Sequence, residues 1–135
     1  MKIYRLLNVI AALCLSVFVA GAQNQPPQTA EEKEKQLLEF VDKEVQRLSH
    51  LLDLEYWQEF YVDSTLTHNY REMDRELTSM QRARVENTDL YLSVRDKWME
   101  RTDSTYRRIF NDTQWAKYWK NTGARSKKAR DKRKK

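Results

Sequence analysis

Apolar residues recur along this chain at the spacing of helix faces. They fall three and four positions apart between Leu38 and Leu52, and again between Leu66 and Met80. Two later segments, ending near residues 110 and 122, also gather their apolar residues on one face. This spacing places a narrow apolar stripe along a helix. It predicts four helical segments, with Asp53 capping the second, a bend near 63–65 and a break at 87–89.

Glycine and proline are missing from residues 28–122. A β protein of that length needs turn residues with positive φ, which are usually glycines, whereas helix interiors need none. The body, 29–122, is therefore predicted to be all-α. Thr29 and Glu32 fit a capping box that begins the first helix. Gly123 fits a helix stop that ends the last one.

The stripes are too narrow to build a thick core from four helices. A thin hairpin in one chain and a dimer that completes the core both fit this pattern. The 3,4 spacing resembles a coiled-coil seam, which favours the dimer. The predicted fold is a long antiparallel helical hairpin with short flanking helices, completed as a homodimer.

The N-terminus differs from the body. Two basic residues precede an apolar run over 6–19, and the small residues at 20 and 22 fit a signal-peptide cleavage site. We predict a signal peptide at 1–22, cleaved between Ala22 and Gln23, and a flexible mature N-terminus at 23–28. A membrane anchor is the alternative, but the run is short and lacks a basic flank after it. Cys14 is the only cysteine, so the exported chain must be stabilised without disulfides.

Positive charge is concentrated at the C-terminus. Residues 120–135 hold nine Lys or Arg and one Asp, whereas 23–119 hold 14 Lys or Arg and 19 Asp or Glu. The mixed charges of the body are typical of solvated helix surfaces and not of a nucleic-acid-binding fold. The like charges of 123–135 predict a disordered tail.

This tail could neutralise an anionic membrane or envelope polymer, or fold back on acidic residues such as Glu31 and Glu39. Its cations are Arg125, Lys127, Lys128, Arg130, Lys132, Arg133, Lys134 and Lys135.

Residues 77–81 read LTSMQ. Thr78 and Gln81 have the spacing of a capping box, which would begin a helix. Leu77 also lies on the 66–80 stripe, so these residues could instead belong to one continuous helix. A weaker copy at Phe110, Asn111 and Gln114 keeps the apolar residue and the Gln and has an Asn cap. We expect a helix start at Asn111, while 54–58 keeps only the Leu and the Gln.

The LTxxQ pattern, with the export signal and the helical body, resembles the Spy/CpxP-like bacterial envelope proteins. That resemblance covers about 29–121. It implies a periplasmic, all-α hairpin that dimerises into a cradle, and a role as an ATP-independent chaperone or in envelope-stress signalling. The partners it implies are unfolded periplasmic proteins or a stress sensor.

Aromatic residues are numerous in the mature chain, and they have two interpretations. They fill a thin core or dimer interface, or some of them form an apolar surface that holds unfolded segments. The candidates for such a client surface are Trp57, Phe60, Tyr61, Trp98, Trp115 and Trp119.

No catalytic pattern is apparent in the sequence. The two histidines, His50 and His68, have no cysteine or His-rich tract beside them, and no Gly-rich phosphate loop exists. We predict a non-enzymatic binding protein of Spy/CpxP type without metal or cofactor. The alternative is a structural protein whose basic tail docks it to an anionic envelope surface.

Overall fold

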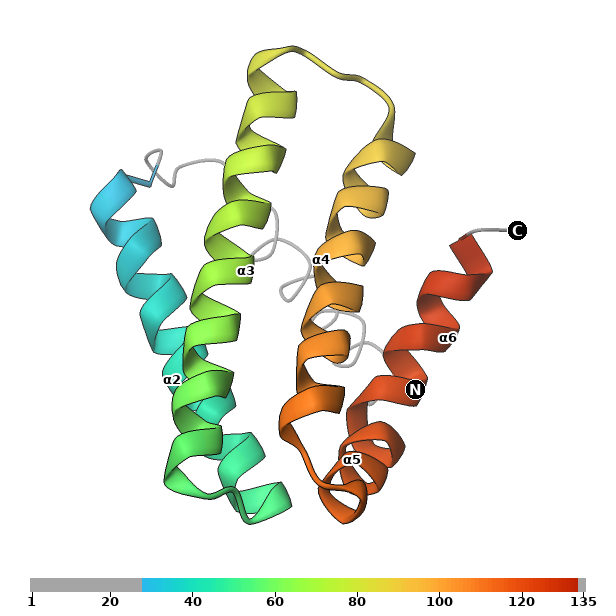
Figure 1. Ribbon diagram of the computed structural model, residues 1–135. Helices are drawn as coiled ribbons and strands as arrows, with labels where there is room; N and C mark the ends of the chain where they lie inside the picture. Colours follow the sequence, from blue (N-terminus) through green and yellow to red (C-terminus); the bar gives the residue numbers. More distant parts are fainter. Residues whose placement is uncertain (1–27, 134–135) are drawn as a thin grey trace, which may run out of the picture. The chain divides into compact units, whose positions relative to one another are not determined.

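A computed structural model of the chain describes residues 28–133 (Figure 1). The predicted signal peptide and its cleavage site lie outside the described residues, as do 23–27 and the tail residues Lys134 and Lys135. The described part is helical and contains no strand, which confirms the all-α prediction. No helix in this part is long and apolar enough to cross a membrane.

Six helical elements follow one another within residues 28–133. They are α2 (Ala30–Leu52), α3 (Tyr56–Arg82), α4 (Thr88–Ile109), α5 (Asp112–Tyr118), the π-helical turn η1 (Trp119–Gly123) and α6 (Ala124–Arg133). The four predicted segments correspond to α2, α3, α4 and α5. The elements η1 and α6 are additions that the apolar pattern did not predict.

The chain divides into two units, Met1–Glu34 and Lys35–Lys135. In the described part of the first unit, the capping box at Thr29 forms as predicted. The Thr29 hydroxyl accepts the backbone N–H of Glu32 at 3.1 Å, and the Glu32 carboxylate accepts the N–H of Thr29 at 2.9 Å. Two donors at the helix start are thereby satisfied.

Helices α3 and α4 form an antiparallel hairpin in the second unit (Figure 1). Asn87 begins α4, where its side chain accepts the N–H of Asp89 at 2.9 Å, so the break predicted at 87–89 is confirmed. One side of α3 is buried, as the residues Gln58, Val62 and Leu66 show. Their spacing of four is the reason that a single face of this helix enters the core.

The main core lies near the ends of α3 and α4 that meet α2 and α5. Its buried members are Val41, Leu48, Leu52, Val62, Leu66, Tyr106, Phe110 and Tyr118. Three of these rings pack together, with the Tyr106 centroid 5.0 Å from Phe110 and 5.3 Å from Tyr118. The helices α2 and α5 therefore thicken one end of the hairpin. The side chains that meet there are far apart in the sequence, so no local pattern predicts their contacts.

Two predicted helix boundaries are wrong. Asp53 does not cap α3: it has a φ of 54° and follows the end of α2, and the cap is Glu55. Gly123 does not end the last helix, because the chain continues through η1 into α6. A Cβ atom at Gly123 would lie 2.3 Å from Cε3 of Trp119. This position is glycine because the indole of Trp119 lies against its backbone.

The predicted disorder of 123–135 is also wrong over Ala124–Arg133, which forms helix α6. The prediction rested on repulsion among like charges. In the structure, carboxylates of α4 neutralise two of the cations. Arg130 Nη2 donates to Asp103 Oδ2 at 2.8 Å, and Arg133 Nε donates to Asp96 Oδ2 at 3.2 Å. Tertiary ion pairs therefore offset the repulsion that a free tail would experience.

Two tyrosines of the core are held in the protonated form. Burial raises the pKa of Tyr106 and Tyr118 far above the usual value, and the bond to Asp103 raises the pKa of Tyr118 further. Phenols of the unfolded chain ionise near pH 10. Because the folded state retains these protons longer, the stabilisation is complete below about pH 10 and is lost as the pH rises above it.

The substitution Tyr106→Phe is expected to stabilise the fold by about 1 kcal/mol, because the buried Tyr106 hydroxyl has no hydrogen-bond partner within 28–133. It should also reduce the loss of stability at alkaline pH. Urea unfolding followed by circular dichroism at neutral and alkaline pH measures both effects. The matched control is Tyr118→Phe, which loses the bond to Asp103 and should destabilise at neutral pH. A destabilised Tyr106→Phe protein would contradict this account.

Candidate functional site

The complete LTxxQ copy does not begin a helix. Leu77, Thr78 and Gln81 lie in the last turns of α3, with Leu77 and Thr78 half-buried and Gln81 exposed. Of the two interpretations that the sequence allowed, the continuous helix is the correct one. The interpretation of Thr78 and Gln81 as a capping box is therefore wrong.

The two weaker copies begin helices α3 and α5. At α5, the Asn111 side chain accepts the N–H of Gln114 at 2.8 Å, and Gln114 Oε1 accepts the N–H of Asn111 at 3.0 Å. This capping box confirms the helix start predicted at Asn111. At α3, Gln58 Oε1 accepts the N–H of Glu55 at 3.0 Å in a second box. That box was not predicted, and the Gln four positions after Leu54 was its only signal in the sequence.

The two capping glutamines contact each other in the interior. Gln58 Nε2 donates to Gln114 Oε1 at 2.7 Å, and Gln114 Nε2 donates to Gln58 Oε1 at 2.9 Å. The residues are 3% and 6% exposed. Gln58 also donates to the carbonyl of Ile109 at 2.8 Å, which lies at the end of α4. This glutamine pair therefore connects the turn before α3 to the turn before α5.

Phe110, the apolar member of the second copy, is buried in the core beside these turns. Neither glutamine is ionisable, and both amides are occupied by hydrogen bonds. The motif residues around Asn111 thus stabilise helix starts and the packing of two turns. They form no open site for a ligand.

Four aromatic residues at the start of α3 are exposed together. We call them the aromatic patch: Tyr56, Trp57, Phe60 and Tyr61, which are 87%, 46%, 62% and 50% exposed. The Tyr61 ring centroid lies 6.2 Å from that of Trp57 and 5.7 Å from that of Phe60. Trp57 Nε1 donates to Glu55 at 2.7 Å. The patch is exposed because the opposite side of this helix enters the core.

The aromatic patch contains three of the six predicted client-surface residues, Trp57, Phe60 and Tyr61. Tyr56 was not predicted, although its spacing of four from Phe60 places it on the same face.

Trp98 is not available to a client, so its prediction is wrong. The residue is buried in α4, and its indole N–H donates to Glu76 at 2.9 Å. Two cations also cover its ring, with the Arg101 guanidinium 4.6 Å and the Lys97 ammonium 5.3 Å from the centroid. Hydrogen bonds from Lys97 and then Trp98 hold the pKa of Glu76 below its usual range.

Trp115 and Trp119 are half-buried and stack on each other, with centroids 5.4 Å apart. The Arg107 guanidinium lies 5.6 Å from the Trp115 ring. Each of them belongs to the packing around α5 and η1. Their place on a client surface stays a prediction.

A polar cluster holds α6 against α4. Arg130 is 4% exposed, and Asp103 accepts both its Nη2 at 2.8 Å and the hydroxyl of Tyr118 at 2.6 Å. Glu100 lies 3.8 Å from Arg130 Nε, which is an ion pair too long for a hydrogen bond. Because a buried charge is tolerated only when it is paired, this cluster explains how Arg130 of a basic helix can be buried.

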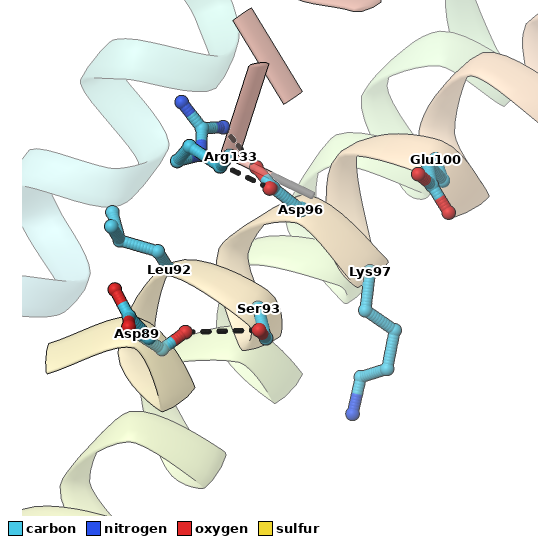
Figure 2. A pocket seen from close by; sticks show the side chains of 7 residues that line it. All are labelled: Asp89, Leu92, Ser93, Asp96, Lys97, Glu100 and Arg133. Atoms are coloured by element: carbon cyan, nitrogen blue, oxygen red, sulfur yellow. Dashed lines mark hydrogen bonds and ion pairs between the residues drawn. The ribbon is translucent and has the colours of Figure 1, made fainter. Parts of the chain in front are cut away.

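A shallow pocket lies beside this cluster (Figure 2). It is lined by Asp89, Leu92, Ser93, Asp96, Lys97, Glu100 and Arg133. Its volume, about 250 Å³, is below the range usual for small-molecule sites. The ion pair between Asp96 and Arg133 also occupies its most buried charges. Among residues 28–133, no three His, Cys, Asp or Glu side chains converge as metal ligands.

The predicted tail cations fall into two groups. Arg130 and Arg133 bind α4, while Arg125, Lys127, Lys128 and Lys132 are exposed.

Comparisons with known protein families, curated proteins and solved structures give no match. Within residues 28–133, the aromatic patch and the exposed cations of α6 are the candidate binding surfaces.

Proposed function

We propose that this protein is a non-enzymatic, ATP-independent binding protein that holds unfolded polypeptide segments on the aromatic patch. The observation that supports this proposal is the concentration of exposed apolar side chains at the aromatic patch. Seven large apolar residues are exposed within 28–133, and four of them lie at 56–61. A contiguous exposed apolar surface of this kind marks an interaction site.

The composition of the patch favours clients of varied sequence. Tyr and Trp offer apolar area together with a polar group, so they accept many contact geometries. Acidic side chains border the patch at Glu55 and Asp63, and both are exposed. This border favours segments that combine apolar with basic residues, because opposite charges promote encounter.

The proposal agrees with the chaperone-like role that the Spy/CpxP resemblance implies, and it includes the periplasmic location and the homodimer expected there. The helical hairpin of α3 and α4 is compatible with that family's architecture. In this proposal, a second copy binds elsewhere and leaves the patch open to clients.

Wild-type protein is expected to suppress aggregation of a chemically denatured client at a several-fold molar excess without ATP. The double substitution Trp57→Ser/Phe60→Ser should raise the concentration needed at least about tenfold, because truncated aromatic anchors each lose more than about 1 kcal/mol of binding. Light scattering measures the suppression. Leu90→Ser is the control, since it removes a side chain that is 48% exposed and lies outside the patch.

Sedimentation equilibrium of the same proteins tests the role of the patch in assembly. We expect twice the monomer mass for wild type and for the Trp57→Ser/Phe60→Ser protein. A wild type that does not suppress aggregation would refute the client-binding role. If the double substitution instead converted a dimer to a monomer, the patch would be a dimer interface. The proposal that the patch is open to clients would then be wrong.

A further inference from the structure

Helix α6 presents two different charged faces. A helix turns about 100° per residue, so Arg125, Lys128 and Lys132 fall within an arc of about 60°. We call these three residues the cationic row. Ser126, Arg130 and Arg133 lie on a separate arc, which faces α4.

The side chains on the arc that faces α4 all form hydrogen bonds or ion pairs. Arg130 donates to Ser126 at 2.8 Å and to Asp103 at 2.8 Å, and Arg133 pairs with Asp96. These bonds fix the rotation of α6 about its own axis, and they thereby determine which side chains face outward.

The cationic row is exposed and makes no ion pair within residues 28–133. Lys127, at the side of the helix, pairs with Asp131 at 2.5 Å. The row therefore carries three uncompensated charges over about 10 Å of helix, in a fixed orientation. An isolated basic tail would have no such order.

We propose that the cationic row binds the surface of an anionic lipid bilayer. Positive side chains near an anionic membrane surface are attracted to its headgroups. The apolar residues of α6 are Ala124 and Ala129, so the helix adsorbs by charge and inserts no large side chain. This function does not depend on client binding by the aromatic patch.

A lipid surface fits this row better than a nucleic acid does. Proteins that bind single strands combine cations with aromatic side chains on which bases stack. Helix α6 has no aromatic residue on which a base could stack. A flat array of headgroups requires only charge, which is what the row supplies.

Co-sedimentation with vesicles of phosphatidylglycerol and phosphatidylcholine, and with phosphatidylcholine alone, tests the proposal. Full-length mature protein should bind the anionic vesicles, and binding should weaken as salt shortens the Debye length from about 10 Å at 0.1 M to about 3 Å at 1 M. Arg125→Gln/Lys128→Gln/Lys132→Gln should lower the partition coefficient about a hundredfold, at about fivefold for each cation. The matched control, Lys43→Gln/Arg82→Gln/Arg108→Gln, removes three exposed cations elsewhere and should bind nearly as wild type.

A charge-conserving exchange separates an oriented row from a basic tail of any shape. Asp131→Lys/Lys132→Asp keeps composition and net charge but places a carboxylate in the row. We expect binding to fall more than about fivefold, with helicity unchanged by circular dichroism. Wild-type binding by this protein, or by the triple Gln protein, would overturn the proposal. Binding to duplex DNA that exceeds binding to anionic vesicles would overturn it in favour of a nucleic-acid role.

Discussion

Replacing Gln58 by Leu is expected to lower the free energy of unfolding by about 3 kcal/mol, because several buried polar groups lose their partners at once. The Gln114 amide loses its reciprocal bonds, and the carbonyl of Ile109 and the N–H of Glu55 each lose one. Each unsatisfied group costs about 1–3 kcal/mol. Glu55 is exposed, so water reaches part of this turn. We therefore expect the total cost to lie near the lower end of the summed range.

Urea unfolding monitored by circular dichroism measures this loss. Gln46→Leu is a suitable control, because Gln46 is exposed on α2 and its bond to Asp42 lies at the surface. It should change stability by less than about 0.5 kcal/mol.

A double-mutant cycle tests the pairing itself. The protein with Gln58→Leu/Gln114→Leu should be more stable than the sum of the single losses implies, by at least about 1 kcal/mol, since neither amide is then left behind. Strictly additive losses would show that the two glutamines act separately, contrary to the geometry.

The second large effect is expected at Arg130, where substitution by Met should release α6 from α4. Asp103 would keep only its bond to Tyr118 in a buried setting. Removing one partner of a buried ion pair costs about 3–5 kcal/mol. Because this cluster is what holds α6 against α4, the loss should appear as local opening of α6, while the core of α3 and α4 remains folded.

Native-state hydrogen exchange of the α6 amides measures this opening, and we expect protection to fall by about a hundredfold or more. Arg108→Met serves as the control, since Arg108 is exposed on α4. Adding Asp103→Asn to Arg130→Met should restore part of the protection, because the uncompensated carboxylate is gone. Unchanged exchange in Arg130→Met would mean that α6 does not depend on this pair.

Features that depend on residues close together in the sequence could be predicted from the sequence alone. The apolar spacing and the lack of Gly and Pro predicted the helices α2, α3, α4 and α5. The boxes at Thr29 and Asn111 could be predicted because both partners lie three residues apart. The box at Glu55 was missed because its cap is a Glu, which the usual preference for Ser, Thr, Asp or Asn does not include.

Features that depend on distant residues were decided by the tertiary structure. Gln58 and Gln114 are 56 positions apart, so no local pattern predicts their contact. A 3.6-residue period identifies an apolar face but not what will cover it, which is why Trp98 and Trp57 were predicted alike although one is buried and the other exposed.

The charged C-terminus illustrates the same limit most clearly. By itself, the sequence of 123–135 determines a run of like charges, and their mutual repulsion opposes folding. The acids that reverse this balance, Asp96 and Asp103, belong to α4 and lie 37 and 27 positions before their arginine partners. Only the packing of α6 on α4 brings the opposite charges together, and only that packing decides which cations remain exposed.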